Sequence, residues 1–270
     1  MIGGIIGTDI KFLVIVGILV MLLLMVSFLV ILVVHQRKKL RFQTDMQDLR
    51  EQQKNQLIEA AVKSEEGERH RIAEQLHDEV GAILSSTRLH FSNIKDDSLD
   101  SGDKQLYEKS KLLLNDAIQQ VRSISHNLHS TLLKEFGLNE AIRNFADKTV
   151  KSDLVTVEVN LDETYLIQNQ QMDIGIYRIF QELLNNILKH AKANYIRITS
   201  ECIEDLYYLR IIYNGIGLSQ EQFEELRYKR EGLGLKNIMN RIILLKGSIL
   251  YERSDMNNSI LLKIPLVKES

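Results

Sequence analysis

The sequence predicts a membrane-anchored protein in which a long helical region precedes a mixed α+β domain. Three observations lead to this prediction. Residues 12–34 form an uncharged apolar run, residues 67–134 repeat apolar side chains with a helical period, and strand and helix patterns alternate after Gly137. A chain of 270 residues is long enough for one or two domains with real cores, and its single proline, Pro265, suits long uninterrupted helices.

The apolar run at residues 12–34 is long enough to cross a bilayer as a helix. A cleaved signal peptide is a poorer interpretation, because no basic segment precedes the run and no small-residue cleavage pattern follows it. Four basic residues come directly after the run: Arg37, Lys38, Lys39 and Arg41. The positive-inside rule therefore places the C-terminal bulk in the cytoplasm. Residues 1–11 are expected to be a short extracytoplasmic tail, without an outer sensor domain.

Residues 35–66 are polar and favour a continuous helical stalk. The apolar residues that fall near heptad positions are Phe42, Met46, Leu49 and Ala60. Gln53 interrupts the apolar seam that these positions would form. The stalk is therefore either a weak coiled coil or a solvated helix. Gly67 is expected to provide a local flex point.

Residues 67–134 predict two antiparallel helices. The first, to about Ile94, has an apolar stripe with His77 and Asp78 just beside it; the stripe is Ile72, Leu76, Val80, Ile83 and Leu84. The second, from about residue 104 to 134, repeats apolar residues every three or four positions: Leu114, Ala117, Val121, Ile124, Leu128 and Leu132. Two helices cannot bury both stripes alone, so a dimeric four-helix bundle is the natural completion.

Residues 135–270 predict an α+β sandwich, with helices stacked on one face of a mixed sheet. Helix patterns cover residues 138–151, 170–192 and 235–246. Strand patterns cover 155–159, 195–202 and 206–213, followed by a closing hairpin of 248–253 and 259–266 around a turn at Asp255–Asn258.

Composition excludes several kinds of site. The net charge of −2 gives no reason to expect direct binding to nucleic acid. Cys202 is the only cysteine, which excludes an internal disulfide and a cysteine-based metal site and fits a reducing compartment.

The helix at residues 170–192 carries a polar face. Glu182, Asn186 and either Lys189 or His190 are spaced so that they share this face. Nucleotide chemistry needs such a set: an oxygen ligand for Mg²⁺, charges for phosphates, and a carboxylate to order water or a proton. A solvent-facing polar stripe is the alternative interpretation.

Two glycine pairs follow this helix in the sequence. Gly215 and Gly217 come after a strand pattern, and Gly232 and Gly234 directly precede a helix pattern. Glycine lets the backbone approach a phosphate, and a helix N-terminus attracts anions. Two pairs flanking the polar loop Ser219–Glu231 are a stronger indication than either pair alone.

Together these motifs resemble the bacterial sensor histidine kinases whose phosphoacceptor box reads LHD, the nitrate-sensor-like type. The resemblance covers about residues 66–266, with four motifs in the family's order. They are ERHRIAEQLHD with His77, QELLNNILKHA with Asn186, NGIG with Gly215 and Gly217, and GLGL with Gly232 and Gly234. The resemblance implies a Bergerat-type ATP-binding domain of the GHKL superfamily at residues 135–270, with ATP and Mg²⁺ as cofactors.

The resemblance also implies roles for individual residues. His77 would take the γ-phosphoryl group of ATP, and Asp78 would accept or orient its imidazole proton. Asn186 would be the Mg²⁺ ligand, with Glu182 behind it as a polarising carboxylate. The remaining expected ATP contacts are Lys189 and His190 to the phosphates and the glycines Gly215, Gly217, Gly232 and Gly234, with residues 218–231 as a lid.

Two positions depart from the family pattern. Tyr213 stands where the family has an aspartate that accepts the adenine amino proton, and a phenol there should weaken adenine recognition by about 1–3 kcal/mol. Asn214 is a candidate to compensate, although its side chain is expected on the opposite face. Ala82 stands where related kinases often carry a glutamine that positions water, so phosphatase activity of the usual kind is not expected.

Three functions therefore stay open, and the first is preferred. The chain is an active histidine kinase, a degenerate kinase that acts as an interaction or heterodimer partner, or an ATPase of the same superfamily without transfer to histidine. Tyr213 supports the second, and the His77–Asp78 pair argues against the third. The expected location is the bacterial inner (cytoplasmic) membrane, crossed once.

The resemblance and the apolar run imply four kinds of partner. These are a second copy of the chain, a separate response regulator whose receiver domain is expected to accompany a DNA-binding domain, membrane lipid, and a membrane protein that supplies the signal. The alternative source of the signal is the state of the bilayer itself.

Overall fold

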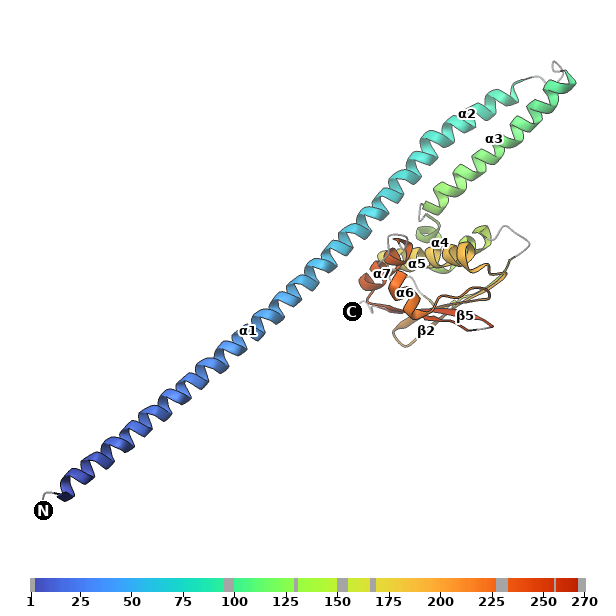
Figure 1. Ribbon diagram of the computed structural model, residues 1–270. Coiled ribbons are helices and arrows are strands. Elements are labelled where there is room, and N and C mark those ends of the chain that lie inside the picture. Colours follow the sequence, from blue (N-terminus) through green and yellow to red (C-terminus); the bar gives the residue numbers. More distant parts are fainter. Residues whose placement is uncertain are drawn as a thin grey trace. The chain divides into compact units, whose positions relative to one another are not determined.

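The computed structural model describes residues 3–94, 100–128, 131–149, 155–165, 169–226, 233–254 and 256–266. The chain divides into two compact units, Met1–Leu57 and Ile58–Ser270. A single long helix, α1 at Gly3–Gln75, contributes residues to both units (Figure 1).

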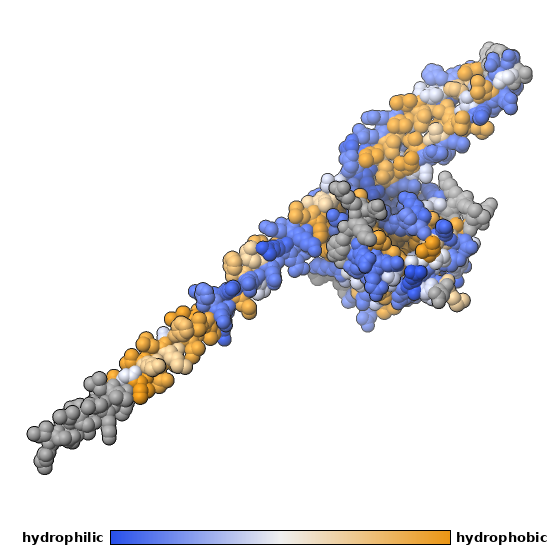
Figure 2. Space-filling view, in the orientation of Figure 1, coloured by the Kyte–Doolittle hydropathy of each residue, from blue (hydrophilic) through white to orange (hydrophobic). Residues whose placement is uncertain are grey.

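The N-terminal unit consists of the first part of α1. Its large apolar side chains between Val16 and Val34 are exposed, and Figure 2 shows them as a hydrophobic surface after the grey segment. Among the described residues, α1 alone is long and apolar enough to cross a membrane, with a mean hydropathy of 3.2 in its apolar window. Length and composition therefore agree with the predicted span. Phe42 and Leu49 are also exposed, so the choice between coiled coil and solvated helix stays open.

In the second unit, α1 passes through Gly67 without a break, so the local flex point predicted at this glycine is not visible as an interruption of the helix. The geometry changes instead at Leu76–Val80, a π-helical turn (η1) that carries His77 and Asp78 and precedes α2 at Gly81–Ser92. Isolated π turns inside helices are frequent at functional sites. The sequence pattern predicted a regular helix here.

The predicted hairpin is formed by α2 and α3 (Ser101–Leu128). Ala73 and Ile118 are buried, and the Ser125 hydroxyl donates to the Ala73 carbonyl at 3.0 Å. The prediction that the second helix continues to Lys134 is wrong. α3 ends at Leu128, whose carbonyl accepts a hydrogen bond from Arg178 of another helix, and α4 (Thr131–Thr149) is a separate helix.

Both arms of the hairpin keep an apolar face exposed in the single chain; Ile83 of the predicted stripe, for example, is 65% exposed. The exposed apolar residues are Val80, Ile83, Leu89, Ile94, Leu106, Leu112, Leu113 and Ile124, and part of this surface is orange in Figure 2. Such a contiguous apolar face requires a partner surface. It is the face that the predicted dimeric bundle would bury.

The C-terminal domain contains a five-stranded sheet of order β1-β2-β3-β5-β4. The strands are β1 (Thr156–Asn160), β2 (Tyr195–Ile203), β3 (Leu206–Tyr213), β4 (Ser248–Glu252) and β5 (Asn258–Pro265). β1 and β2 are parallel, and the other neighbours are antiparallel. Alternate side chains of β3, up to Tyr213 at its end, are buried, as a half-covered strand requires.

Helices cover one face of this sheet (Figure 1). They are α4, α5 (Gln170–Asn186), α6 (Gln220–Leu226) and α7 (Leu233–Leu244). α5 starts at Asn169, whose side chain accepts from the Gln171 amide, and it buries Ile176, Ile179 and Phe180 completely. The predicted α+β sandwich is therefore confirmed.

The predicted turn of the last hairpin is wrong at one end. Asn258 is the first residue of β5, pairs with Tyr213 of β3 and is only 2% exposed. Its amide nitrogen donates to the Gly215 carbonyl at 3.0 Å, a tertiary contact that fixes it in the strand. Asp255, at the other end of the predicted turn, lies outside the described residues.

Candidate functional site

The polar face predicted on residues 170–192 occupies the end of α5 and the π-helical turn that follows it, Ile187–Ala191 (η3). Glu182 and Asn186 are half-buried, whereas Lys189 and His190 are exposed on the turn. The opposite face is anchored in the core by Ile179, Leu183, Leu184 and Ile187. The apolar anchors thus hold the polar groups at a fixed helix end.

Gly215 brings the loop after β3 against the end of η3. Its φ is +91°, and a Cβ there would lie 2.2 Å from the Ala191 carbonyl oxygen. The Ile216 amide donates to the same oxygen at 2.8 Å. Because the backbone at residue 215 is both left-handed and crowded, only glycine fits there. The loop with Gly215 and Gly217 is thereby held against the end of the helix that carries Asn186.

The other glycines make two further close contacts. A Cβ on Gly217 would lie 1.8 Å from Asn258 Oδ1, and one on Gly234 would lie 2.0 Å from Glu182 Oε1. α7 therefore presents the second glycine motif directly to the carboxylate of α5. Gly232 lies outside the described residues, as do residues 227–231 of the predicted lid.

These residues suit a magnesium triphosphate. At Gly234, backbone that carries no side chain lies close to the Glu182 carboxylate. A carboxylate and an amide oxygen such as that of Asn186 are ligand types that Mg²⁺ accepts. The exposed cation of Lys189 suits phosphate. In the described part of the chain there is no cluster of three or more His, Cys, Asp or Glu that could hold a metal. A magnesium ion here would therefore depend on nucleotide phosphates for most of its ligands.

Tyr213 occupies a core position rather than an open one. It is 3% exposed, and burial raises its pKa, partly offset by a hydrogen bond from the Leu218 backbone. Next to it, the Asn214 side-chain oxygen accepts the backbone N–H groups of Asn194 at 3.0 Å and Tyr195 at 3.1 Å. The Asn214 amide is therefore engaged in holding the start of β2, which leaves no support for a compensating role in adenine binding.

His77 and Asp78 are exposed on η1 and line a hollow of about 300 Å³. Ala82, Ser85 and, from α3, Arg122 also line it. None of the predicted nucleotide-site residues that the structure describes lines this hollow, so the structure does not bring His77 to them. Arg122 was missed from the sequence, where its only signal was a position beside Val121 of the packed stripe.

Two protein families match this chain, one over each of these sites. The family described as "Histidine kinase" matches residues 68–133, which include His77. The family described as "Histidine kinase-, DNA gyrase B-, and HSP90-like ATPase" matches residues 171–268, which include Glu182 and both glycine motifs. This chain belongs to the histidine kinases.

Named relatives are similar to this histidine kinase over most of its length. Sensor histidine kinase MctS of Rhizobium johnstonii is 24% identical over 223 residues, covering 77% of this chain and 45% of the relative. Sensor protein VraS of Staphylococcus saprophyticus is 28% identical over 205 residues, covering 76% and 57%. A solved catalytic domain of histidine kinase ThkA is 21% identical, covers 48% of this chain and 93% of that chain, and has a TM-score of 0.42. The kinase described here spans about half the length of the curated relatives.

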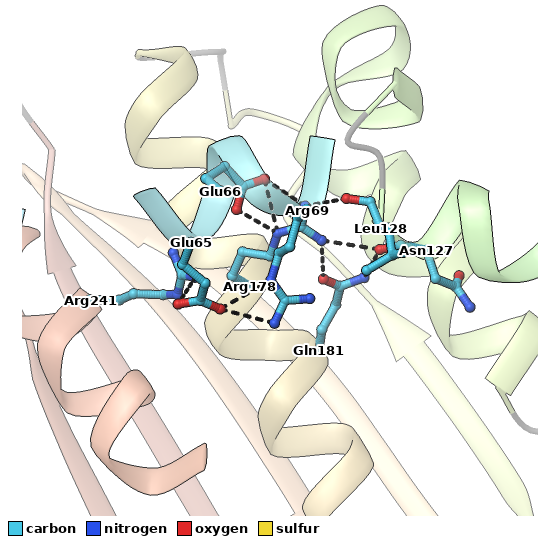
Figure 3. Close-up of polar contacts among 8 residues, drawn as sticks. All are labelled: Glu65, Glu66, Arg69, Asn127, Leu128, Arg178, Gln181 and Arg241. Atoms are coloured by element: carbon cyan, nitrogen blue, oxygen red, sulfur yellow. Dashed lines mark hydrogen bonds and ion pairs between the residues drawn. The ribbon is translucent and has the colours of Figure 1, made fainter. Parts of the chain in front are cut away.

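A cluster of charged residues that the sequence pattern did not reveal joins α1 of this kinase to its ATPase-like domain (Figure 3). We call Glu65, Glu66, Arg178 and Arg241 the arginine clamp. Arg178 of α5, with a side chain 3% exposed, bonds the Glu66 carboxylate through Nη2 at 2.6 Å and Nε at 3.0 Å. Arg241 of α7 pairs with Glu65 at 3.0 Å.

Arg178 also caps α3. Its guanidinium donates to the carbonyls of Asn127 at 3.1 Å and Leu128 at 2.6 Å, which are left without helical partners at the end of that helix. A cation is also favoured at the negative end of the helix dipole. One buried side chain therefore fixes three helices together. The sequence indicated only that Arg178 lies four residues before Glu182 on the same face, not its contacts with α1 and α3.

The clamp changes the ionisation of its members. Burial alone would raise the pKa of Glu66, but the hydrogen bonds and charge of Arg178, together with the charges of Arg241 and Arg69, hold it below its ordinary value. Burial lowers the pKa of Arg241, and the nearby Glu65 and Glu66 carboxylates partly offset this. Beside the clamp lies a cavity of about 320 Å³, whose lining also includes Glu182 and Asn185. The clamp and Glu182 thus share one cavity.

Proposed function

We propose that this chain is a sensor histidine kinase that transfers the γ-phosphoryl group of ATP to His77 and then to an aspartate of a separate response regulator. The observation that carries the proposal is the contact between Gly234 and Glu182. It places a glycine motif at a helix N-terminus against a carboxylate on the Asn186 helix, the arrangement that phosphate and Mg²⁺ binding requires.

In the proposed reaction a lone pair on one His77 nitrogen forms the bond to the γ-phosphorus, and the bond to the bridging oxygen breaks, so that ADP leaves with that electron pair. Asp78 accepts or orients the proton on the other ring nitrogen, which makes the attacking nitrogen more nucleophilic. Asn186 would be a ligand of Mg²⁺, with Glu182 behind it as a polarising carboxylate. The bound Mg²⁺ would neutralise charge on the phosphates. Lys189 and His190 are proposed to bind the phosphates of ATP.

Arg122 has a proposed role at the phosphoacceptor. It lines the same hollow as His77, so its guanidinium can neutralise a phosphoryl group on the imidazole. Because the nucleotide-site residues do not line this hollow, transfer requires the ATPase-like domain to take another position, or transfer to the second subunit of a dimer. The exposed apolar face of the hairpin supports such a dimer.

Autophosphorylation of the full chain in detergent with radiolabelled Mg-ATP tests the proposal. We expect an acid-labile, base-stable label on the wild type, no label on His77→Gln, and a much reduced rate for Glu182→Gln. Arg122→Gln should shorten the lifetime of the label without affecting nucleotide binding. An acid-stable label, or equal labelling of His77→Gln, would contradict the proposal.

A degenerate kinase is the second candidate, and the burial of Tyr213 at the adenine-recognition position favours it. This form of the protein would act as an interaction or heterodimer partner. It predicts no label on the wild type, no binding of Mg-ATP, and phosphorylation of His77 only in a heterodimer with an active subunit.

The apolar segment at residues 12–34 supports a single-pass location in the bacterial inner membrane, with the kinase portion in the cytoplasm. We propose that the signal comes from a membrane partner protein through this segment. Replacing it with an unrelated apolar helix of the same length should abolish regulation in cells, while autophosphorylation in detergent persists. Unchanged regulation would exclude both a partner and the bilayer as the source.

A further inference from the structure

Asn258 carries a buried polar atom that has no hydrogen-bond partner among the residues the structure describes. The side chain is 2% exposed, and its amide nitrogen donates to the Gly215 carbonyl at 3.0 Å. That bond fixes which side of the amide carries the oxygen. Among the described residues, Asn258 Oδ1 accepts no hydrogen bond. A buried acceptor without a donor is costly, so a donor from outside the described residues, such as a bound ligand, would stabilise this oxygen.

The oxygen lies at the expected purine position. Asn258 is directly opposite Tyr213 in the register of β3 and β5, and paired side chains on one face lie about 5 Å apart at Cβ. Both side chains are on the buried side of the sheet. On its other side, Asn258 Oδ1 lies against Gly217, where a Cβ would come within 1.8 Å of it. The acceptor is therefore placed between the Tyr213 strand and the first glycine loop.

A second unpartnered atom lies in the same region. The Tyr251 hydroxyl on β4 is buried and, within the described part of the chain, has no hydrogen-bond partner. Its ring stacks on Phe223 of α6 with 4.6 Å between the ring centroids, which places it between the sheet and α6. Burial raises its pKa, with smaller contributions from Tyr213 and Glu182. A phenol can donate, whereas the Asn258 oxygen only accepts. The edge of an adenine base offers the complementary pair, an amino donor and ring-nitrogen acceptors.

We infer that Asn258 Oδ1 accepts the exocyclic amino group of adenine in this chain, at the place where Tyr213 supplies no carboxylate. The inference rests on the proposed function, because it assumes that ATP binds here. It also predicts base selectivity: guanine carries a carbonyl oxygen where adenine carries the amino group, so two acceptors would face each other. Asn258 is thus a specificity-determining residue, not a catalytic one.

Equilibrium binding to the full chain in detergent tests this inference, with three Mg²⁺-loaded probes: ATP, GTP and purine riboside triphosphate, which is ATP without the amino group. We expect the wild type to prefer ATP over purine riboside triphosphate by about tenfold, the value of one good hydrogen bond to a buried partner. Asn258→Leu should lose this preference and still bind purine riboside triphosphate like the wild type. Tyr208→Phe, the matched control on the opposite face of β3, should keep the preference. Tyr213→Phe tests the neighbouring phenol as an alternative acceptor and should also keep the preference.

The outcomes separate this inference from the proposed function. A wild type that binds ATP and purine riboside triphosphate equally would overturn the role of Asn258 while leaving a nucleotide site. Loss of the preference in Tyr213→Phe but not in Asn258→Leu would assign the acceptor to Tyr213 instead. A wild type that binds none of the probes would overturn both the inference and the ATP site. If Asn258→Leu fails to fold, Asn258→Asp decides: it retains an acceptor and should keep the preference, and loss of the preference there would also overturn the inference.

Discussion

Glu66→Gln removes one charge from the arginine clamp and keeps the shape of the side chain. In the wild type the Glu66 carboxylate receives hydrogen bonds from Arg178 Nε and Nη2, while Arg178 is almost completely buried. The glutamine would retain one oxygen acceptor but leave the guanidinium without its counter-charge. We expect a lower stability of the unit that contains α3, α5 and the clamped end of α1.

The magnitude follows from what remains around Arg178. Breaking a fully buried ion pair by removing one partner costs about 3–5 kcal/mol. Here the Glu66 side chain is 24% exposed, and Arg178 keeps acceptors on Asn127, Leu128 and Gln181. Hydrogen bonds to charged groups exceed neutral ones by about 1–2 kcal/mol, so we expect a loss of about 1.5–3 kcal/mol for Glu66→Gln.

Thermal unfolding of the full chain in detergent measures this loss. A domain of this size loses about 2–4 °C per kcal/mol, so the midpoint should fall by about 3–12 °C. The matched control is Glu68→Gln, because Glu68 makes an exposed pair with Arg71 on the same helix and should have no measurable effect. Equal midpoints for Glu66→Gln and Glu68→Gln, or strict additivity of Glu66→Gln with Arg178→Gln, would refute the reasoning.

The contribution of Glu66 also depends on pH. Its pKa is lower in the folded protein than the ordinary value of 4.5, so the folded state binds fewer protons than the unfolded state. The stabilisation is therefore complete above the unfolded pKa and is lost as the pH falls through the folded pKa. Below about pH 4.5, the difference in unfolding midpoint between wild type and Glu66→Gln should shrink, and a difference that grows in acid would contradict this assignment.

Three further substitutions test the nucleotide site. Gly234→Ala should displace only the flexible end of Glu182, so the unfolding midpoint should change little while Mg-ATP binding and autophosphorylation fall; an unchanged rate would argue against the contact. Gly215→Ala meets the rigid Ala191 carbonyl at a positive φ and should cost at least about 1–3 kcal/mol of stability by thermal unfolding, more than any other glycine change in this loop. Tyr213→Asp would bury a carboxylate in the core, so it should lower the unfolding midpoint rather than simply restore adenine binding. A spectroscopic measurement of folding would show whether the loss of stability or the gain in adenine binding dominates.

The sequence alone determined most of the elements and the motif positions of this protein, although it indicated a polar loop over Ser219–Glu231 where the structure has α6 at Gln220–Leu226. The apolar run, the helical stripes around His77 and Ala117, and the alternation of β3 are local periodicities, and local periodicity follows from which face of an element is buried. The glycines at positions 215, 217 and 234 were also predictable as close approaches of backbone. In each case the signal lies within a few residues of the feature it predicts.

The tertiary structure decided what depends on contacts between distant residues. Glu66 and Arg178 are separated by 112 positions, and no spacing rule connects them. The same arginine caps the end of α3 at Leu128. Asn258 reads as a turn residue in sequence, but its bond to Gly215 makes it a buried strand residue. A polar side chain is buried only where the rest of the fold supplies its partners, and those partners are chosen by packing rather than by neighbouring sequence.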